Sequence, residues 1–201
     1  MSQRYRFENL FVLIIVCVQL IASGCTLKPE DKFESKPIYQ TIPAIIGVSV
    51  KNSFRLSNYK HTLVDVEFGE SSVALFLQVF ESMFKNITEL PKWPPWKTYK
   101  HDQDAIIELD SSQIDLTIGD NLINPDVVTV LYTVCLYKPD GEQIKCWTTQ
   151  ATKSHQRILV EYTLVSSSIK PIVEGAMRAS IADFMKSFEN DQAVQKWQSS
   201  L

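Results

Sequence analysis

One four-residue stretch contains the side chains of a serine nucleophile and an activating base. Ser57-Asn58-Tyr59-Lys60 matches the Ser-x-x-Lys pattern, in which the serine attacks a carbonyl group. The Ser-Asp-Asn and Lys-Thr-Gly elements that accompany this pattern in enzymes are missing from the sequence. Because four-residue matches are common by chance, we expect no active site at Ser57.

A second polar stretch, His101-Asp102-Gln103-Asp104, contains residue types that bind metals. Adjacent residues of a polar loop rarely converge on one ion, and the other histidines, His61 and His155, lie far away in the sequence. The sequence also has no Gly-x-Ser-x-Gly motif, no phosphate-binding loop and no dinucleotide-binding fingerprint among its six glycines. We therefore expect no catalytic residues, no metal and no cofactor.

The sequence Lys138-Pro139-Asp140-Gly141-Glu142 separates two segments of alternating character. Proline followed by Asp-Gly suits a type I turn with glycine in the left-handed position, which predicts a β-hairpin formed by residues 127–137 and 143–153. In this register Lys138 faces Glu142, and one face of the hairpin is almost wholly apolar. The predicted cross-strand pairs are Leu136 with Ile144, Val134 with Cys146 and Tyr132 with Thr148.

Two cysteines, Cys135 and Cys146, lie eleven residues apart across this hairpin. In an oxidising compartment such a pair can form a disulfide, and a two- or four-residue loop would place the two residues directly opposite each other. The three-residue loop favoured by Pro-Asp-Gly instead shifts the register by one and sends the two side chains to opposite faces. We therefore favour free thiols, with the disulfide as the alternative.

The N-terminal stretch has the organisation of an export signal. Arg4 and Arg6 supply a basic lead, residues 10–20 form an apolar block, and residues 22–24 are small. The apolar block is much shorter than the ~18 residues that a membrane-spanning helix needs. We expect residues 1–24 to be removed by cleavage between Gly24 and Cys25.

The sequence Ala22-Ser23-Gly24-Cys25 resembles the lipobox of bacterial lipoproteins, although alanine stands at 22 where leucine is usual. The resemblance implies that Cys25 carries the two or three acyl chains typical of lipoproteins, such as palmitate. Thr26, rather than an acidic residue, follows the cysteine, which by the enteric sorting rule implies the periplasmic face of the outer membrane. The alternative is an ordinary secretory signal that is cut at the same bond.

Length and composition indicate one ordinary globular domain. Removal of the signal leaves 177 of the 201 residues, which is enough for a single core. The net charge of −3 for the whole chain becomes −4, because the signal contains Arg4, Arg6 and Glu8. A mildly acidic chain without a basic cluster is unsuited to nucleic acid and lacks the polybasic patch of a peripheral membrane protein. Membrane attachment is therefore expected to be covalent.

The mature chain is expected to begin with a flexible tether. Residues 25–43 are rich in Pro, Lys, Glu, Asp and Ser and show little periodicity. The globular domain, residues 44–201, begins with a strand over residues 44–51. Further strand candidates are residues 62–68, 105–109 and 114–118, of which the last two are either linked or merged into one strand through a bulge.

Two amphipathic helices are predicted to cover one face of the sheet. The first opens at Gly69-Glu70-Ser71-Ser72, with Ser71 or Ser72 as N-cap, and the second follows Ser166-Ser167-Ser168. This organisation predicts a single α+β domain with a largely antiparallel sheet. The apolar residues of the two predicted helices recur at spacings of three and four: Val73, Phe76, Leu77, Phe80, Phe84 and Ile87 in the first helix, and Val173, Ala176, Met177, Ile181, Phe184 and Phe188, with Ser180, in the second.

Two surfaces are candidates for binding another protein. Trp93 and Trp96 lie among prolines in the loop after the first helix, and tryptophan is enriched in interface hot spots. The alternative is that both rings fold back over the sheet edge. The second candidate is the open side of the sheet, with Leu131, Thr133, Tyr137 and Trp147.

The order of elements resembles that of envelope lipoproteins of the TolB-N-terminal-like and CsgG-like kind, which include YajG-like lipoproteins. The features that carry this resemblance are the strand at residues 44–51, the Gly-Glu-Ser helix entry, the Pro-Asp-Gly hairpin and the last helix. The resemblance covers most of residues 44–188. It implies an α+β sandwich that serves as a docking or assembly module, and it transfers no catalytic residue.

These observations together predict a non-enzymatic, lipid-anchored module of a cell-envelope complex, whose partner is an envelope protein or a second copy of the chain. One alternative is a carrier for a lipid, glycan or small solute, with a cavity lined by Phe76, Phe80 and Phe84. A periplasmic hydrolase that uses Ser57 or His61 is the other alternative.

Overall fold

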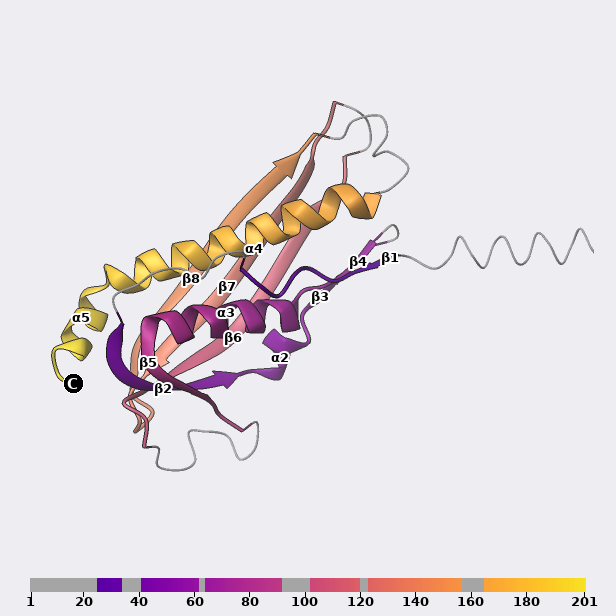
Figure 1. The fold of residues 1–201 in the computed structure, drawn as a ribbon. Coiled ribbons are helices and arrows are strands. Elements are labelled where there is room, and N and C mark those ends of the chain that lie inside the picture. Colours follow the sequence, from indigo (N-terminus) through magenta and orange to yellow (C-terminus); the bar gives the residue numbers. More distant parts are fainter. Residues whose placement is uncertain (1–24, 34–40, 62–63, 92–101, 120–122, 157–164) are drawn as a thin grey trace, which may run out of the picture.

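A computed structural model describes residues 25–33, 41–61, 64–91, 102–119, 123–156 and 165–201. The export signal and the loop with Trp93 and Trp96 lie outside the described residues. The described ranges form a single α+β domain, and Figure 1 shows its long helices gathered on one face of the main sheet. The predicted fold class is therefore confirmed.

The main sheet has five strands in the order β5-β2-β6-β7-β8. The strands β6, β7 and β8 pair antiparallel, whereas β2 is parallel to both β5 and β6. The antiparallel half thus contains the longest ladders, and the parallel pairings of β2 with β5 and β6 are shorter. The strands are β2 (Ile42–Val50), β5 (Phe84–Glu89), β6 (Ala105–Thr117), β7 (Asp126–Tyr137) and β8 (Gln143–His155).

Strand β6 contains both segments that the sequence predicts at residues 105–109 and 114–118. Its pairing with β7 shifts between Leu109 and Ser111, so a bulge joins the two segments into one strand. This is the second of the two predicted alternatives. The bulge keeps apolar residues on the same face at both ends, since Leu109 and Ile114 are each less than 5% exposed.

The predicted helices correspond to α3 (Gly69–Met83) and α4 (Val165–Glu189), followed by the short α5 (Gln192–Gln198). The apolar positions predicted for α4 are all buried, because they face the sheet. A further short helix, α2 (Asn52–Arg55), follows β2. Within the described residues, no helix combines the length and hydrophobicity required to cross a membrane.

The prediction for the first helix is wrong at both ends. No serine caps its N-terminus, because Ser72 Oγ bonds Phe68 O at 2.7 Å and the Ser71 hydroxyl donates to Pro29 O at 2.8 Å. At the other end, α3 stops at Met83, and residues 84–89 form β5 instead of continuing the helix to Ile87. Pairing with β2 outweighs helical spacing in this segment, whose Asn, Ile and Thr are weak helix formers.

The core between helices and sheet is dominated by aromatic rings. Phe76 lies edge-to-face against Tyr132 and Phe184, with ring centroids 5.2 and 5.7 Å apart. Phe76, Phe80 and Phe84 are each at most 2% exposed. These rings pack against one another in the space that the carrier hypothesis assigns to a ligand.

The segment of residues 25–33, which we call the N-terminal strap, lies between α3 and α4 (Figure 1). Its strand β1 (Cys25–Leu27) is parallel to β4 (Val64–Glu67), which in turn pairs with β3 (Asn58–Lys60) in a small second sheet. Leu27 is only 5% exposed, and burial of a leucine contributes about 2 kcal/mol. The sequence predicts a flexible tether here, whereas the structure packs these nine residues onto the domain.

Candidate interaction surface

The face of the main sheet opposite the helices, which we call the open face, is formed by alternate residues of β6, β7 and β8. In β7 the buried positions, such as Val130 and Tyr132, alternate with half-buried ones that point away from the helices. The cross-strand pairs extend this face to both neighbours. Its residues include Glu108, Ser111, Gln113, Asp115, Thr129, Leu131, Thr133, Cys135, Tyr137, Cys146, Thr148, Gln150 and Thr152.

The hairpin turn forms as the sequence predicts. Lys138 N donates to Glu142 O at 2.8 Å, and Gly141 N donates to Lys138 O at 3.0 Å. Gly141 has a φ of +91°, the left-handed conformation that a glycine adopts without strain. The predicted pairing of Lys138 with Glu142 is therefore confirmed.

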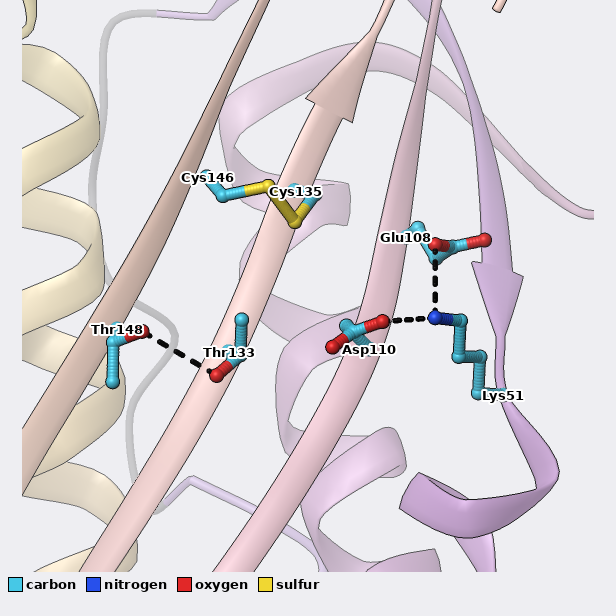
Figure 2. The surroundings of a disulfide bond; sticks show 7 residues. All are labelled: Lys51, Glu108, Asp110, Thr133, Cys135, Cys146 and Thr148. Atoms are coloured by element: carbon cyan, nitrogen blue, oxygen red, sulfur yellow. Dashed lines mark hydrogen bonds and ion pairs between the residues drawn. A yellow bond between two sulfur atoms is a disulfide. The ribbon is translucent and has the colours of Figure 1, made fainter. Parts of the chain in front are cut away.

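The predicted register beyond the turn is wrong by one residue. Tyr137 pairs with Gln143 but Leu136 pairs with Lys145, so Ile144 is an extra residue in β8. This bulge places Cys135 opposite Cys146, with 4.0 Å between the Cα atoms, and the two form the disulfide that the sequence analysis did not favour (Figure 2). The turn sequence contains no signal for a bulge two residues beyond it.

The corrected register also changes the position of Trp147. Trp147 pairs with Val134 and faces the helices, where it is 7% exposed and its ring centroid lies 5.6 Å from that of Phe184 and 5.3 Å from that of Phe188. It is therefore a core residue and does not belong to the open face. Leu131 and Thr133 do lie on the open face, as predicted, and both are half-buried.

Tyr137 lies on the open face but is covered by a small apolar cluster. Its neighbours in the cluster are Leu90, Ile106 and Cys135, and its own side chain is 7% exposed. Gly47 of β2 allows this cluster to form, because a Cβ at that position would lie 2.6 Å from the Ile106 side chain. The disulfide thus forms part of a second, smaller core on this side of the sheet.

A charged group borders this small core (Figure 2). Lys51 Nζ lies 3.6 Å from Glu108 Oε1 and also bonds the carboxylate of Asp110. Glu108 is only 6% exposed, so its charge requires a nearby cation. The hydrogen bond to Asp110 and the proximity of Glu108 raise the pKa of Lys51. Burial and the negative charge of Glu108 raise the pKa of Tyr137.

The rest of the open face is polar but uncharged in its centre. Thr129 and Thr152 share a hydrogen bond of 2.9 Å, and Thr133 and Thr148 share one of 3.4 Å, seen beside the disulfide in Figure 2. These cross-strand threonine pairs contribute to the pairing of the two strands. Leu131 lies between the two pairs along β7. The result is a polar surface around one apolar residue, with threonines along the strands and Gln113 and Gln150 directly beside Leu131.

Ser57, considered as a nucleophile, and Asp104, considered as a metal ligand, are both engaged in local structure. Ser57 Oγ donates to the carbonyl of Ser53 at 2.7 Å and lies 2.7 Å from Ser112 Oγ. Asp104 accepts a hydrogen bond of 2.7 Å from the backbone of Ile45. Among the described residues there is no group of three or more His, Cys, Asp or Glu side chains arranged to hold a metal ion.

A cavity of about 380 Å³ lies at the end of the domain where α5 meets the start of β2. It is half open and is not lined by the phenylalanines of the carrier hypothesis. Its walls contain both polar and apolar residues: Thr41, Ile42, Pro43, Met83, Glu189, Gln198 and Leu201.

Comparison with known proteins gives two remote structural similarities. A Xanthomonas campestris protein of the DUF330 family has a TM-score of 0.44 at 8% identity, covering 82% of this chain and 99% of that one. A minor lipoprotein from Acinetobacter baumannii has a TM-score of 0.39 at 9% identity, covering 70% of this chain and 89% of that one. No family model and no curated protein matches the sequence. Neither of these two proteins is named as a member of the TolB-N-terminal-like, CsgG-like or YajG-like group, so the resemblance to that group stays a prediction.

Proposed function

We propose that this protein is a non-enzymatic docking module of the bacterial cell envelope. In this proposal a lipid on Cys25 anchors it to the periplasmic face of the outer membrane. The open face binds an envelope protein or a second copy of the chain, and Leu131 is its central apolar contact.

The observation that carries the proposal is the contrast between the two faces of the main sheet. The long helices α3 and α4 cover one face, whereas the open face presents threonines and Leu131 on strands joined by a disulfide. A rigid surface loses little conformational entropy on binding, so such a face is suited to docking. The local hydrogen bonds of Ser57 favour this reading over a hydrolase.

The anchor is tested by the intact mass of the protein from the membrane fraction, with Cys25→Ala as the comparison. The expected wild-type chain begins at Cys25 and carries diacylglycerol, and the variant is unlipidated. A wild-type chain with a bare N-terminus would contradict the anchor and would indicate a secreted protein.

The docking face is tested with a photo-crosslinking amino acid placed at Leu131 in cells. We expect one discrete crosslinked product, either a heteromeric complex or a dimer of this chain. Asp183, which is exposed on the helix side, serves as the matched control position. Equal crosslinking from Leu131 and Asp183, or none from Leu131, would contradict docking through the open face.

A further inference from the structure

The N-terminal strap leaves little slack between Cys25 and the domain. Cys25 pairs directly with Val64, Thr26 with Asp65 and Leu27 with Val66. A flexible tether over residues 25–43 would give a reach of about 60 Å at about 3.4 Å per residue. Since backbone pairing begins at Cys25 itself, no flexible residue would separate a lipidated Cys25 from the domain.

The strap is bound to α3 and β4 along its length. Lys28 Nζ lies 3.1 Å from Glu67 Oε2, and the Ser71 hydroxyl donates to the carbonyl of Pro29 at 2.8 Å. Phe33 N donates to Gln78 Oε1 at 3.2 Å, and the Gln78 amide also donates to the carbonyl of Asp31. These contacts are spread over several residues, so no single exposed ion pair holds the strap.

The other side of the strap is bound to α4. Glu30 N donates to Glu174 Oε1 at 2.8 Å, while Arg178 donates to the carbonyl of Lys32 at 3.2 Å and lies 3.6 Å from the Glu30 carboxylate. The strap therefore bridges the two long helices. Its direction relative to the domain is fixed by contacts on both sides.

Strand β1, which begins at Cys25, lies toward the end of the domain where α4 begins and where β6 and β8 end (Figure 1). At this end Thr117 pairs with Val127, and Asp126 pairs with His155. The connection between β6 and β7 contains Ile123, whose side chain is 82% exposed. An anchor at Cys25 would bring this end, with its exposed isoleucine, next to the lipid headgroups.

We infer that the docked strap holds the domain in one orientation on a lipid bilayer, with the end of β6, the start of β7 and the end of β8 facing the headgroups. This inference rests on the proposed lipidation of Cys25 and adds a second, non-covalent contact with the membrane. The open face then stands at a steep angle to the bilayer, where a membrane-anchored partner can reach it.

The test uses the full chain, processed in bacteria and reconstituted in vesicles of phosphatidylethanolamine and phosphatidylglycerol that contain a diazirine-headgroup lipid. Crosslinked peptides are mapped by mass spectrometry. We expect most crosslinks within residues 117–119, 123–127 and 150–156. A 12-residue Gly/Ser insertion after Cys25 restores slack and is expected to lower crosslinking at these residues several-fold and to spread it over the domain.

The same insert placed after Leu201 is the matched control and should leave the crosslink map unchanged. A lipidated wild-type chain with a map as spread as that of the Cys25 insertion would overturn the fixed orientation while leaving the proposed anchor intact. A chain that carries no lipid, as read by intact mass, would overturn the anchor itself. Rapid hydrogen exchange of the strap amides in the vesicle-bound protein would also overturn the inference.

Discussion

Cys135 lies directly opposite Cys146 because one extra residue, Ile144, enters strand β8 just after the hairpin turn. The turn alone would place these cysteines on opposite faces of the sheet. The bulge compensates for that offset, so that the disulfide joins two neighbouring strands in the small core with Tyr137. The four predictions below follow from this register and from the contacts around it.

The disulfide is expected to contribute to stability. Replacement of both cysteines, Cys135→Ser with Cys146→Ser, should lower the free energy of unfolding by about 3 kcal/mol, because an eleven-residue separation closes a short loop in the unfolded chain. Urea unfolding followed by circular dichroism measures this change. Wild-type protein with a reducing agent should shift to the same midpoint, and an unchanged midpoint would argue against the bond.

Deletion of Ile144 tests the bulge directly. The remaining residues of β8 would keep their partners, because Gln143 already pairs with Tyr137 and Lys145 with Leu136. We expect the variant to retain the disulfide and to lose about 1 kcal/mol of stability through the missing side chain. A thiol assay reads the disulfide.

Deletion of Thr148 is the matched control for the bulge. This deletion turns the side chains on one side of the deleted position in β8 to the opposite face of the sheet. It should therefore lower the free energy of unfolding several times more than the deletion of Ile144 does. Equal effects of the two deletions would mean that Ile144 is an ordinary ladder residue.

The two faces of the hairpin should respond very differently to truncation. Trp147→Ala removes a ring that packs on Phe184 and Phe188 and is expected to lower the free energy of unfolding by about 3–5 kcal/mol. Leu131→Ala, on the half-buried open face, should cost less than about 1 kcal/mol. Chemical unfolding of both variants checks the assignment, and similar losses would contradict it.

Lys51 gives a pH-dependent contribution to stability. Its pKa is raised in the folded state, so its contribution is fully present below the ordinary lysine pKa and is lost as the pH rises through the folded-state value. Lys51→Met should cost about 1 kcal/mol near pH 8, because nearly half of the lysine side chain is exposed and the pairing is screened.

The difference in unfolding free energy between wild type and Lys51→Met should shrink as the pH rises through the raised folded-state pKa of Lys51, where the lysine loses its charge. Lys138→Met, which breaks a solvent-exposed pair with Glu142, is the comparison variant. A difference that is independent of pH would show that Lys51 acts through packing of its hydrocarbon chain.

The sequence determined the elements whose signals are local. The spacing of Val173, Ala176 and Phe184 predicted the buried face of α4, and Pro-Asp-Gly predicted the turn and its glycine conformation. The alternation in β6 predicted two segments that either stay separate or merge through a bulge. These features depend on neighbours within a few residues, which periodicity and turn chemistry describe well.

Tertiary structure decided the features that depend on distant partners. Pairing with β2 turned residues 84–89 into a strand although their spacing fits a helix. The bulge at Ile144 decided which face Trp147 and the cysteines occupy, since a shift of one residue reverses every side chain. The polar N-terminal strap became part of the domain because α3 and α4 supply hydrogen-bond partners that its own sequence does not reveal.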